Sequence, residues 1–243
     1  MMSDPSPMRT PPPSFFESAR ALGLDFEPAE IEQLGNWLVL LEEANQRMNL
    51  TRITDPESAW HRHVLDSLSL LPLLESVEAH SLLDVGSGGG APGLPLAITL
   101  PKLSVGLLDS VGKKARFLQE TVDHLRLSSV RVLNDRAESL AAIGSPEREA
   151  WDVVCARAVG RLPVLLELTI PFLREGGLLL AIKGQQASVE IEESRGALHA
   201  LHARVIDTLE TPTGTVVVVE KARKTPKRYP RKSGEPARNP LPG

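Results

Sequence analysis

The chain has 243 residues, of which 42% are hydrophobic, and its formal net charge at pH 7 is −4. This length suits one domain of ordinary size with an appendage, and the composition is that of a globular protein with a sizeable core. No run of 18 apolar residues occurs, which argues against a membrane span. The single cysteine, Cys155, excludes an intramolecular disulfide and fits a reducing compartment, so we expect a cytoplasmic protein.

The first 75 residues are expected to form a leader and a helical extension. Residues 1–13 contain three consecutive prolines and no apolar signal core, which predicts a disordered leader. Apolar residues recur every three or four positions after Pro28, as on one face of a helix. Asp55 and Pro56 are typical of a helix start. The extension, 14–75, is therefore predicted to hold helices over 14–22, over 28–47 and from 55 towards 71.

From residue 81 the pattern changes to short apolar segments that alternate with helical ones. Such alternation predicts a parallel sheet covered on both faces. The predicted strands are 81–85, 103–109, 130–134, 151–155, 178–182, 204–209 and 213–220. The predicted helices are 94–100, 112–126, 137–143, 162–173 and 187–203. Because the last two strands are joined by only a short turn, they must be antiparallel. We therefore expect an α/β domain over 76–220 with a mostly parallel sheet of about seven strands.

The most informative segment is the strand at 81–85 and the glycine-rich turn that follows it, Gly86 to Gly93. Glycine lacks a Cβ, so this turn can adopt positive φ and let a ligand approach the backbone. The spacing of Gly86, Gly88 and Ala91 also satisfies the dinucleotide fingerprint, and Asp109 follows at the end of the next strand. The turn therefore predicts a nucleotide-type cofactor, either NAD or S-adenosylmethionine.

Three features favour S-adenosylmethionine over NAD. Asp84 lies inside the strand, where its carboxylate could organise the turn or hold the ammonium group of the cofactor. Pro92 and Gly93 are awkward for a helix that packs against a pyrophosphate. The antiparallel terminal pair is expected of a methyltransferase sheet rather than of a dehydrogenase sheet.

The C-terminal residues 221–243 carry eight Lys or Arg and one acid, Glu235, whereas the rest of the chain is acidic. A concentrated basic tail suggests a polyanionic partner. A disordered, solubilising terminus is the alternative. His61 and His63 lie two residues apart and would point in different directions on a helix, so we expect no metal site.

An ordered set of motifs resembles one family. The set consists of Met48 to Thr51; Arg62 to Leu68; the glycine turn through Gly93; Leu108 to Ser110 with Lys113 to Leu118; Arg136 to Glu138; Ala156 to Ala158; Lys183 to Gln185; and Lys224 to Lys232. In these segments the chain resembles the bacterial small-subunit ribosomal RNA methyltransferase G family, also called glucose-inhibited division protein B. The glycine turn alone is weakly specific, but the ordered set is highly specific.

The resemblance implies a Rossmann-like class I methyltransferase that moves a methyl group from S-adenosylmethionine to N7 of one guanine in the decoding-region loop of 16S rRNA, leaving S-adenosylhomocysteine. It implies a cofactor pocket formed by Asp84, Gly86, Gly88, Ala91, Asp109, Ser110, Ala137, Glu138 and Arg157. Arg157 and Arg136 are expected to position the reactants, because N7 carries a lone pair and no proton and needs no general base. The expected RNA-binding residues are Arg62, His63, Lys113, Lys114, Lys183, Lys227, Arg228 and Arg231. We expect a monomer whose partner is the small ribosomal subunit.

Two rival functions remain at this point. One is a methyltransferase that acts on another RNA, a small molecule or a protein, and the other is an NAD-binding oxidoreductase. A catalytically idle RNA-binding factor with the same fold is a third possibility.

Overall fold

The computed structural model describes residues 6–211 and 213–242, and its centre is a sheet of seven strands in the order β3-β2-β1-β4-β5-β7-β6. The strands are β1 (Ser81–Val85), β2 (Ser104–Leu108), β3 (Val130–Leu133), β4 (Trp151–Arg157), β5 (Leu173–Lys183), β6 (Ala203–Thr211) and β7 (Gly214–Lys221). The chain runs outward from β1 to β3 and then returns to start β4 beside β1. The order therefore places a topological switch point between β1 and β4, which is where open α/β sheets bind ligands.

The first five strands pair in parallel, and β7 pairs antiparallel with both β5 and β6. This confirms the predicted mixed sheet with an antiparallel end. Strands β4 and β5 are longer than predicted. Leu173 pairs with Trp151 before the register shifts, so residues 173–177 join the strand although Gly176 and Gly177 interrupt its apolar pattern.

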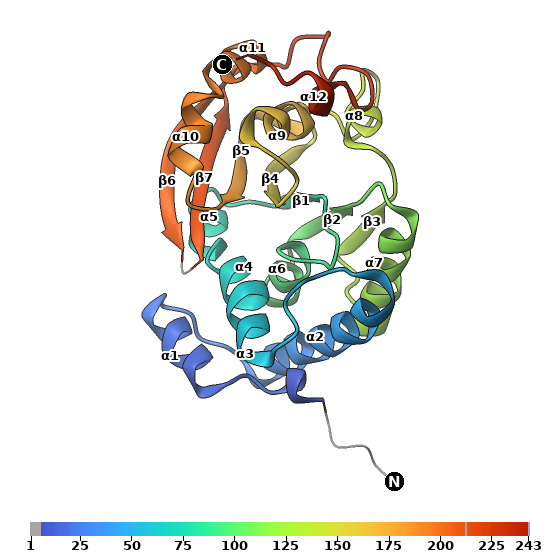
Figure 1. Cartoon of the computed structure of the whole chain (residues 1–243), viewed down its shortest axis with the longest axis vertical. Helices are drawn as coiled ribbons and strands as arrows, with labels where there is room; N and C mark the ends of the chain where they lie inside the picture. The colour runs from blue at the N-terminus through green and yellow to red at the C-terminus, as the bar shows by residue number, and fades with distance from the viewer. Residues whose placement is uncertain (1–5, 212, 243) are drawn as a thin grey trace.

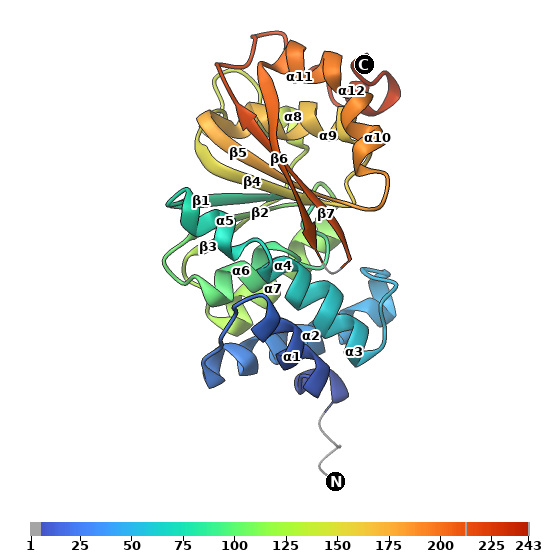
Figure 2. The ribbon, with the colours of Figure 1, turned by 90° about the vertical axis from the view of Figure 1, so that its left-hand side faces the viewer.

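Helices cover both faces of the sheet (Figures 1 and 2). One layer and the N-terminal extension consist of α1 (Pro13–Ala21), α2 (Pro28–Met48), α3 (Pro56–Ala59), η2 (Trp60–Leu65), α4 (Asp66–Leu68), α5 (Leu71–Ser76), α6 (Gly93–Thr99) and α7 (Gly112–Leu125). The other layer contains α8 (Ala137–Leu140), α9 (Leu162–Thr169), η3 (Ile170–Phe172), α10 (Ala187–Glu192), α11 (Arg195–Leu201) and α12 (Glu235–Arg238). Among the described residues, no helix is long and apolar enough to cross a membrane.

The segment predicted as one helix from 55 to 71 is broken into short pieces. Asp55 caps its start as expected, since Asp55 Oδ1 accepts from the Ser58 N–H at 2.8 Å. The backbone then widens into a π-helical stretch, η2, before α4. Such stretches often occur at functional sites because they change which side chains face inward. Here His63 and Asp66 are both buried beside the sheet.

Three other helices are shorter than predicted, and α8, predicted over 137–143, ends at Leu140. The segment 162–173 ends its α-helix at Thr169 and continues as the 3-10 turn η3, where Pro171 cannot donate a helical hydrogen bond. The segment 187–203 divides into α10 and α11 at Ser194, whose hydroxyl donates back to the Glu190 carbonyl at 2.6 Å. A serine that bonds its own helix in this way competes with the backbone ladder.

Both ends of the described chain pack against the body. Residues 1–5 of the predicted leader lie outside the described residues, but Pro7–Arg9 forms the 3-10 turn η1 with Met8 buried. The Met8 carbonyl accepts from Trp60 Nε1 at 3.0 Å, which ties η1 to the N-terminal extension. At the other end, β7 runs to Lys221, so the sheet includes the first residue of the predicted tail.

Candidate functional site

Two clefts open at the carboxyl ends of the strands on either side of the β1–β4 switch point. The first, here called the carboxylate cleft, has a volume of about 260 Å³. Its lining residues are Val85, Gly86, Leu108, Asp109, Ser110, Asp135, Arg136, Ala137, Glu138, Val159, Leu168, Gly234 and Ala237. Five predicted cofactor residues therefore meet here: Gly86, Asp109, Ser110, Ala137 and Glu138. Arg136 lies at the same cleft and is exposed.

The glycine turn is fixed to the end of β2 by backbone and carboxylate hydrogen bonds. The Gly86 N–H donates to the Leu108 carbonyl at 2.8 Å. Asp109 is 6% exposed and accepts twice, with Oδ2 from the Gly88 N–H at 3.0 Å and Oδ1 from the Val111 N–H at 2.8 Å. Asp109 thus joins the turn after β1 to the turn after β2, and its carboxylate is held at the cleft in one orientation.

Gly86 is also required by close packing. Its φ is +77°, a conformation that side-chain-bearing residues rarely adopt, and a Cβ at this position would lie 2.6 Å from Val159 Cγ2. The turn after β1 and the loop after β4 therefore touch at Gly86. Both residues line the carboxylate cleft.

Four predicted cofactor residues do not line the carboxylate cleft: Asp84, Gly88, Ala91 and Arg157, of which Gly88 is bound to Asp109 and Arg157 lines the second cleft described below. Asp84 is 1% exposed, and its Oδ2 accepts from the Gly93 N–H at 3.1 Å. Because successive strand residues face opposite sides of a sheet, Asp84 points towards α6 while Val85 points to the cleft. Burial raises the pKa of Asp84 to about 6. Ala91 is buried in the core on the α6 side. Asp84 therefore organises the turn, as one of the two predicted roles requires.

The second cleft, here called the arginine cleft, has a volume of about 350 Å³. Its lining residues are Ile53, Arg62, His63, Asp66, Arg157, Ala158, Ile182, Lys183, Gly184, Glu190 and Thr213. Arg157 is the last residue of β4 and lies across the cleft from η2. Its Nη1 donates to the Arg62 carbonyl at 2.6 Å, and its Nη2 lies 3.1 Å from His63 Nδ1. Arg157 therefore joins the sheet to the N-terminal extension.

These contacts determine the protonation of His63. A guanidinium can only donate, so His63 Nδ1 must accept, and the proton then resides on Nε2. Nε2 lies 3.0 Å from Thr51 Oγ1, which gives that proton an acceptor. Burial and the charges of Arg157 and Arg62 lower the pKa of His63 to about 3. His63 is therefore a neutral, buried positioning group and does not fit the predicted role as a phosphate contact.

The other basic residues predicted to contact RNA differ in exposure and in their internal contacts. Lys183 Nζ donates to the Gly160 carbonyl at 2.7 Å and pairs with Glu190, and Arg231 is paired with the buried Glu167. Both cations are occupied by internal contacts, which leaves them little capacity for phosphate. Arg62 is exposed at the arginine cleft. Along the surface, Lys113, Lys227 and Arg228 are exposed and Lys114 is half-buried.

Comparison with known proteins connects this geometry to a family. A family model described as rRNA small subunit methyltransferase G matches residues 30–214. A protein of Sorangium cellulosum with that name, ribosomal RNA small subunit methyltransferase G, is 47% identical over 222 residues, covering 91% of this chain and 92% of the relative. Its counterpart in Acetivibrio thermocellus is 40% identical over 231 residues, covering 93% of this chain and 94% of the relative.

The chain belongs to the rRNA small subunit methyltransferase G family. The resemblance drawn from its motifs is thereby confirmed, and the oxidoreductase alternative is excluded.

Solved structures agree with this assignment at the level of the fold. The O-methyltransferase from Bacillus cereus, solved in complex with SAH, has a TM-score of 0.58 and 17% identity, and the alignment covers 84% of this chain and 96% of that chain. A methyltransferase from Geobacter sulfurreducens has a TM-score of 0.52 and 15% identity, covering 85% and 97%. The predicted class I methyltransferase fold is confirmed.

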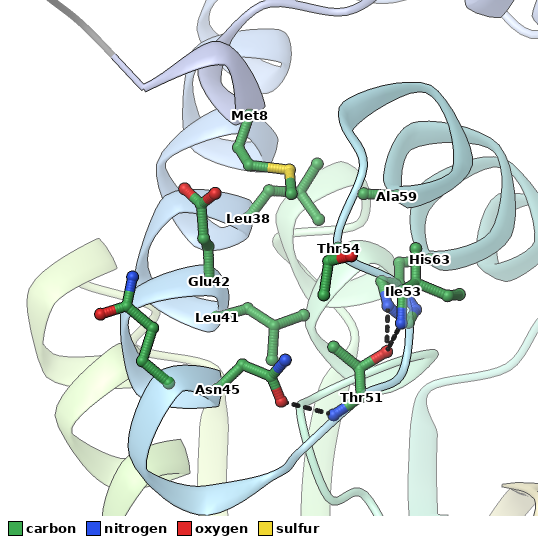
Figure 3. A pocket seen from close by; sticks show the side chains of 11 residues that line it. Met8, Leu38, Leu41, Glu42, Asn45, Thr51, Ile53, Thr54, Ala59 and His63 are labelled. Carbon is green, nitrogen blue, oxygen red and sulfur yellow. Dashed lines mark hydrogen bonds between the residues drawn. The ribbon is translucent and has the colours of Figure 1, made fainter.

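A third cavity, of about 270 Å³, lies in the N-terminal extension (Figure 3). Figure 3 shows Leu38 and Leu41 of α2 on one side and Thr51, Ile53 and His63 on the other. The arginine cleft shares Ile53 and His63 with this cavity. Both ring nitrogens of His63 are already engaged, so the ring forms a fixed partition between the two spaces.

Sequence reasoning missed several residues at the clefts. Asp66 lines the arginine cleft, whereas the sequence suggested only that it could cap the N-terminal helices or pin them to the sheet. Gly234 and Ala237 line the carboxylate cleft although they lie about 100 residues beyond Glu138. Only the three-dimensional path of the tail brings them there, and no sequence pattern indicates it.

His63 gives a prediction for stability against pH. The pKa of His63 in the folded protein is about 3, below the usual 6.5. As the pH falls, His63 therefore binds a proton in the unfolded chain before it does so in the folded protein. The contribution of neutral His63 to the free energy of unfolding is fully present above the usual pKa and is lost as the pH falls towards 3. Between about pH 7 and about pH 5, we expect His63 to account for a loss of about 2 kcal/mol in the free energy of unfolding.

The measurement is urea unfolding of the wild type and of His63→Gln across this pH range. Glutamine keeps polar atoms but has no titration, so the variant should show a shallower loss. Equal pH slopes in the two proteins would contradict the assignment of a neutral, buried His63.

Proposed function

We propose that this protein transfers the methyl group of S-adenosylmethionine to N7 of one guanine in the 16S rRNA of the small ribosomal subunit. Membership of the rRNA small subunit methyltransferase G family supports rRNA methylation. The geometry of the arginine cleft supports N7 of guanine as the methylated atom. One observation carries it: His63, Lys183 and Glu190 of the arginine cleft are engaged in internal contacts, and N7 methylation needs no general base.

The carboxylate cleft fits the nucleoside part of S-adenosylmethionine. Asp109 and Glu138 supply acceptors for ribose hydroxyl and adenine amino donors, and Gly86 lines the cleft where a Cβ would collide with Val159. Ser110 and Ala137 complete this side of the cleft, and Gly88 keeps the turn bound to Asp109. When bound, the cofactor supplies an activated methyl group on a sulfonium.

The side chains of the arginine cleft are suited to position a base rather than to move a proton. His63 is neutral with both nitrogens bonded, and Glu190 Oε2 accepts from Lys183 and from the Leu162 N–H. Asp66 is buried; its Oδ2 accepts from Thr213, and its Oδ1 has no hydrogen-bond partner among the described residues. Arg157 can orient guanine through hydrogen bonds to O6, the usual arginine contact of that base. Rate acceleration then comes from in-line alignment of the two reactants.

RNA would approach over the cations left free at the surface. Arg62 stands at the mouth of the arginine cleft, and Lys113, Lys227 and Arg228 are exposed elsewhere. Such contacts bind phosphates without reading sequence and weaken as salt rises. The target guanine must be presented unstacked to enter the cleft. We further propose that the protein acts as a monomer in the cytoplasm.

The test is to incubate the protein with S-adenosylmethionine and, separately, with deproteinised 16S rRNA, small subunits and 23S rRNA. All RNAs should come from cells that lack the gene. Chemical cleavage at N7-methylguanosine followed by primer extension locates the product. We expect one modified guanine in the decoding region of 16S rRNA. Methylation confined to 23S rRNA, or at a guanine amino group, would overturn the proposal.

A further inference from the structure

We propose that the C-terminal segment Thr225 to Pro242, here called the strap, forms one wall of the cofactor site and sets the orientation of Glu138. The proposal rests on the assignment of the carboxylate cleft to the cofactor. The strap lies within residues 221–243, which the sequence predicts to be a basic tail that binds RNA. Its contacts in the structure indicate a second role, as a wall of the part of the site that binds the nucleoside of the cofactor.

A buried ion pair fixes the strap to helix α9. Glu167 is 0% exposed, and its two oxygens accept the backbone N–H, Nε and Nη2 of Arg231 at 2.6–3.0 Å. Arg231 Nη2 also donates to the Asn239 carbonyl at 2.7 Å, which closes the strap into a loop. A fully buried carboxylate with a matched guanidinium holds its partner in a defined geometry.

Further contacts hold the strap on either side of Arg231. Arg148 donates to the carbonyls of Thr225 and Tyr229 at 3.1 and 2.9 Å. Glu149 accepts from the Thr225 N–H at 2.9 Å and from Lys221, whose side chain is buried. Tyr229 and Leu241 belong to the core on this face of the sheet. The strap is therefore an anchored part of the domain over its whole described length.

The anchored strap reaches the carboxylate cleft. In Figure 1 its helix α12 lies beside α8 and α9. The Gly234 N–H donates to Glu138 Oε1 at 2.7 Å, and Gly234 and Ala237 both line the cleft. One oxygen of Glu138 is thus fixed by the strap, which leaves Oε2 to accept from a ligand. A carboxylate oxygen can only accept, so Oε2 is suited to a donor such as an amino or hydroxyl group of a nucleoside.

The strap also explains a division among the basic residues near the C-terminus. Lys221 and Arg231 neutralise buried or half-buried acids of the body, whereas Lys227 and Arg228 remain exposed. Lys221 and Arg231 hold the strap against the domain. Lys227 and Arg228 are available to bind RNA.

The main test is Ala237→Trp, because Ala237 is exposed and the indole would enter the cleft without disturbing the core. The matched control is Ala222→Trp, which places the same side chain at an exposed position away from both clefts. Calorimetry with S-adenosylhomocysteine should show binding weakened at least about tenfold in Ala237→Trp and unchanged in Ala222→Trp. The KM for S-adenosylmethionine should rise similarly, while the KM for RNA stays within about twofold.

A second measurement uses the wild-type protein and does not depend on a variant. Trypsin cleaves after Lys227 and Arg228 once the strap lifts, so S-adenosylhomocysteine should slow this cleavage if the strap is a wall of its site. The proposal is overturned if Ala237→Trp binds S-adenosylhomocysteine as tightly as the wild type, or if the ligand gives no protection. If the wild type itself fails to bind S-adenosylhomocysteine, the cofactor assignment fails instead.

Discussion

Replacing Arg157 with alanine is expected to lower kcat/KM for RNA methylation by about a hundredfold or more, the cost of a small misplacement of reacting groups. Arg157 is the residue through which the end of β4 contacts Arg62 and His63 of the N-terminal extension. Without it, the arginine cleft loses both its base-orienting donor and the bond that fixes the ring of His63. Affinity for S-adenosylhomocysteine should change by less than about threefold, because Arg157 does not line the carboxylate cleft.

Two further variants sharpen this prediction. Arg157→Lys keeps the positive charge but cannot donate to two acceptors in a fixed fork, so it should remain nearly as impaired as the alanine variant. Arg195→Ala removes an arginine whose side chain pairs with Glu192 at the surface and should leave activity unchanged. The assignment would be contradicted if Arg157→Lys restored full activity, since charge alone would then suffice.

The fold was largely predictable because its signals are local. Short apolar segments that alternate with helical ones predicted all seven strands, and the short turn between the last two strands predicted the antiparallel edge. The errors lie where tertiary contacts override local preference. Residues 173–177 extend β5 through two glycines because the neighbouring β4 offers a partner at Trp151. The segment 55–71 breaks into α3, η2 and α4, and within η2 the ring of His63 contacts both Trp37 of α2 and Arg157 of β4.

The candidate site was predictable only in its composition. The motifs named Gly86, Asp109, Ala137 and Glu138, and the structure brings these together at one cleft. They could not tell which way Asp84 points, because that depends on which face of β1 the cleft occupies. The motifs also suggested that Lys183 and Arg231 are free to bind phosphate. In the structure Lys183 pairs with Glu190, and Arg231 pairs with Glu167, which is far from it in the sequence.

The tail shows how charge counting alone can mislead. Its positive charge predicted a polyanionic partner, and Lys227 and Arg228 still fit that prediction. However, a count does not distinguish a solvated lysine from one buried against an acid. Lys221 is fully buried, and the acids of the body that receive the tail are spread from Glu138 to Glu167. The acidic body and basic tail are therefore partly partners of each other.

Replacing Arg231 with methionine is expected to lower the free energy of unfolding by about 3 kcal/mol, a typical cost of leaving a buried charge without its partner. Glu167 is 0% exposed, and three of its hydrogen bonds come from the Arg231 side chain. Urea unfolding followed by tryptophan fluorescence measures the loss, since Trp37, Trp60 and Trp151 are all buried in the body.

The double variant Arg231→Met with Glu167→Gln isolates the charge as the cause. Glutamine keeps an acceptor for the Arg231 backbone N–H but carries no charge, so the double variant should recover at least about half of the lost stability. Lys232→Met is the matched control, because Lys232 is exposed beside Arg231, and its stability should be within about 0.5 kcal/mol of the wild type. If the double variant were as unstable as Arg231→Met, lost packing of the arginine stem would be the cause, and the strap would be held by shape rather than by its ion pair.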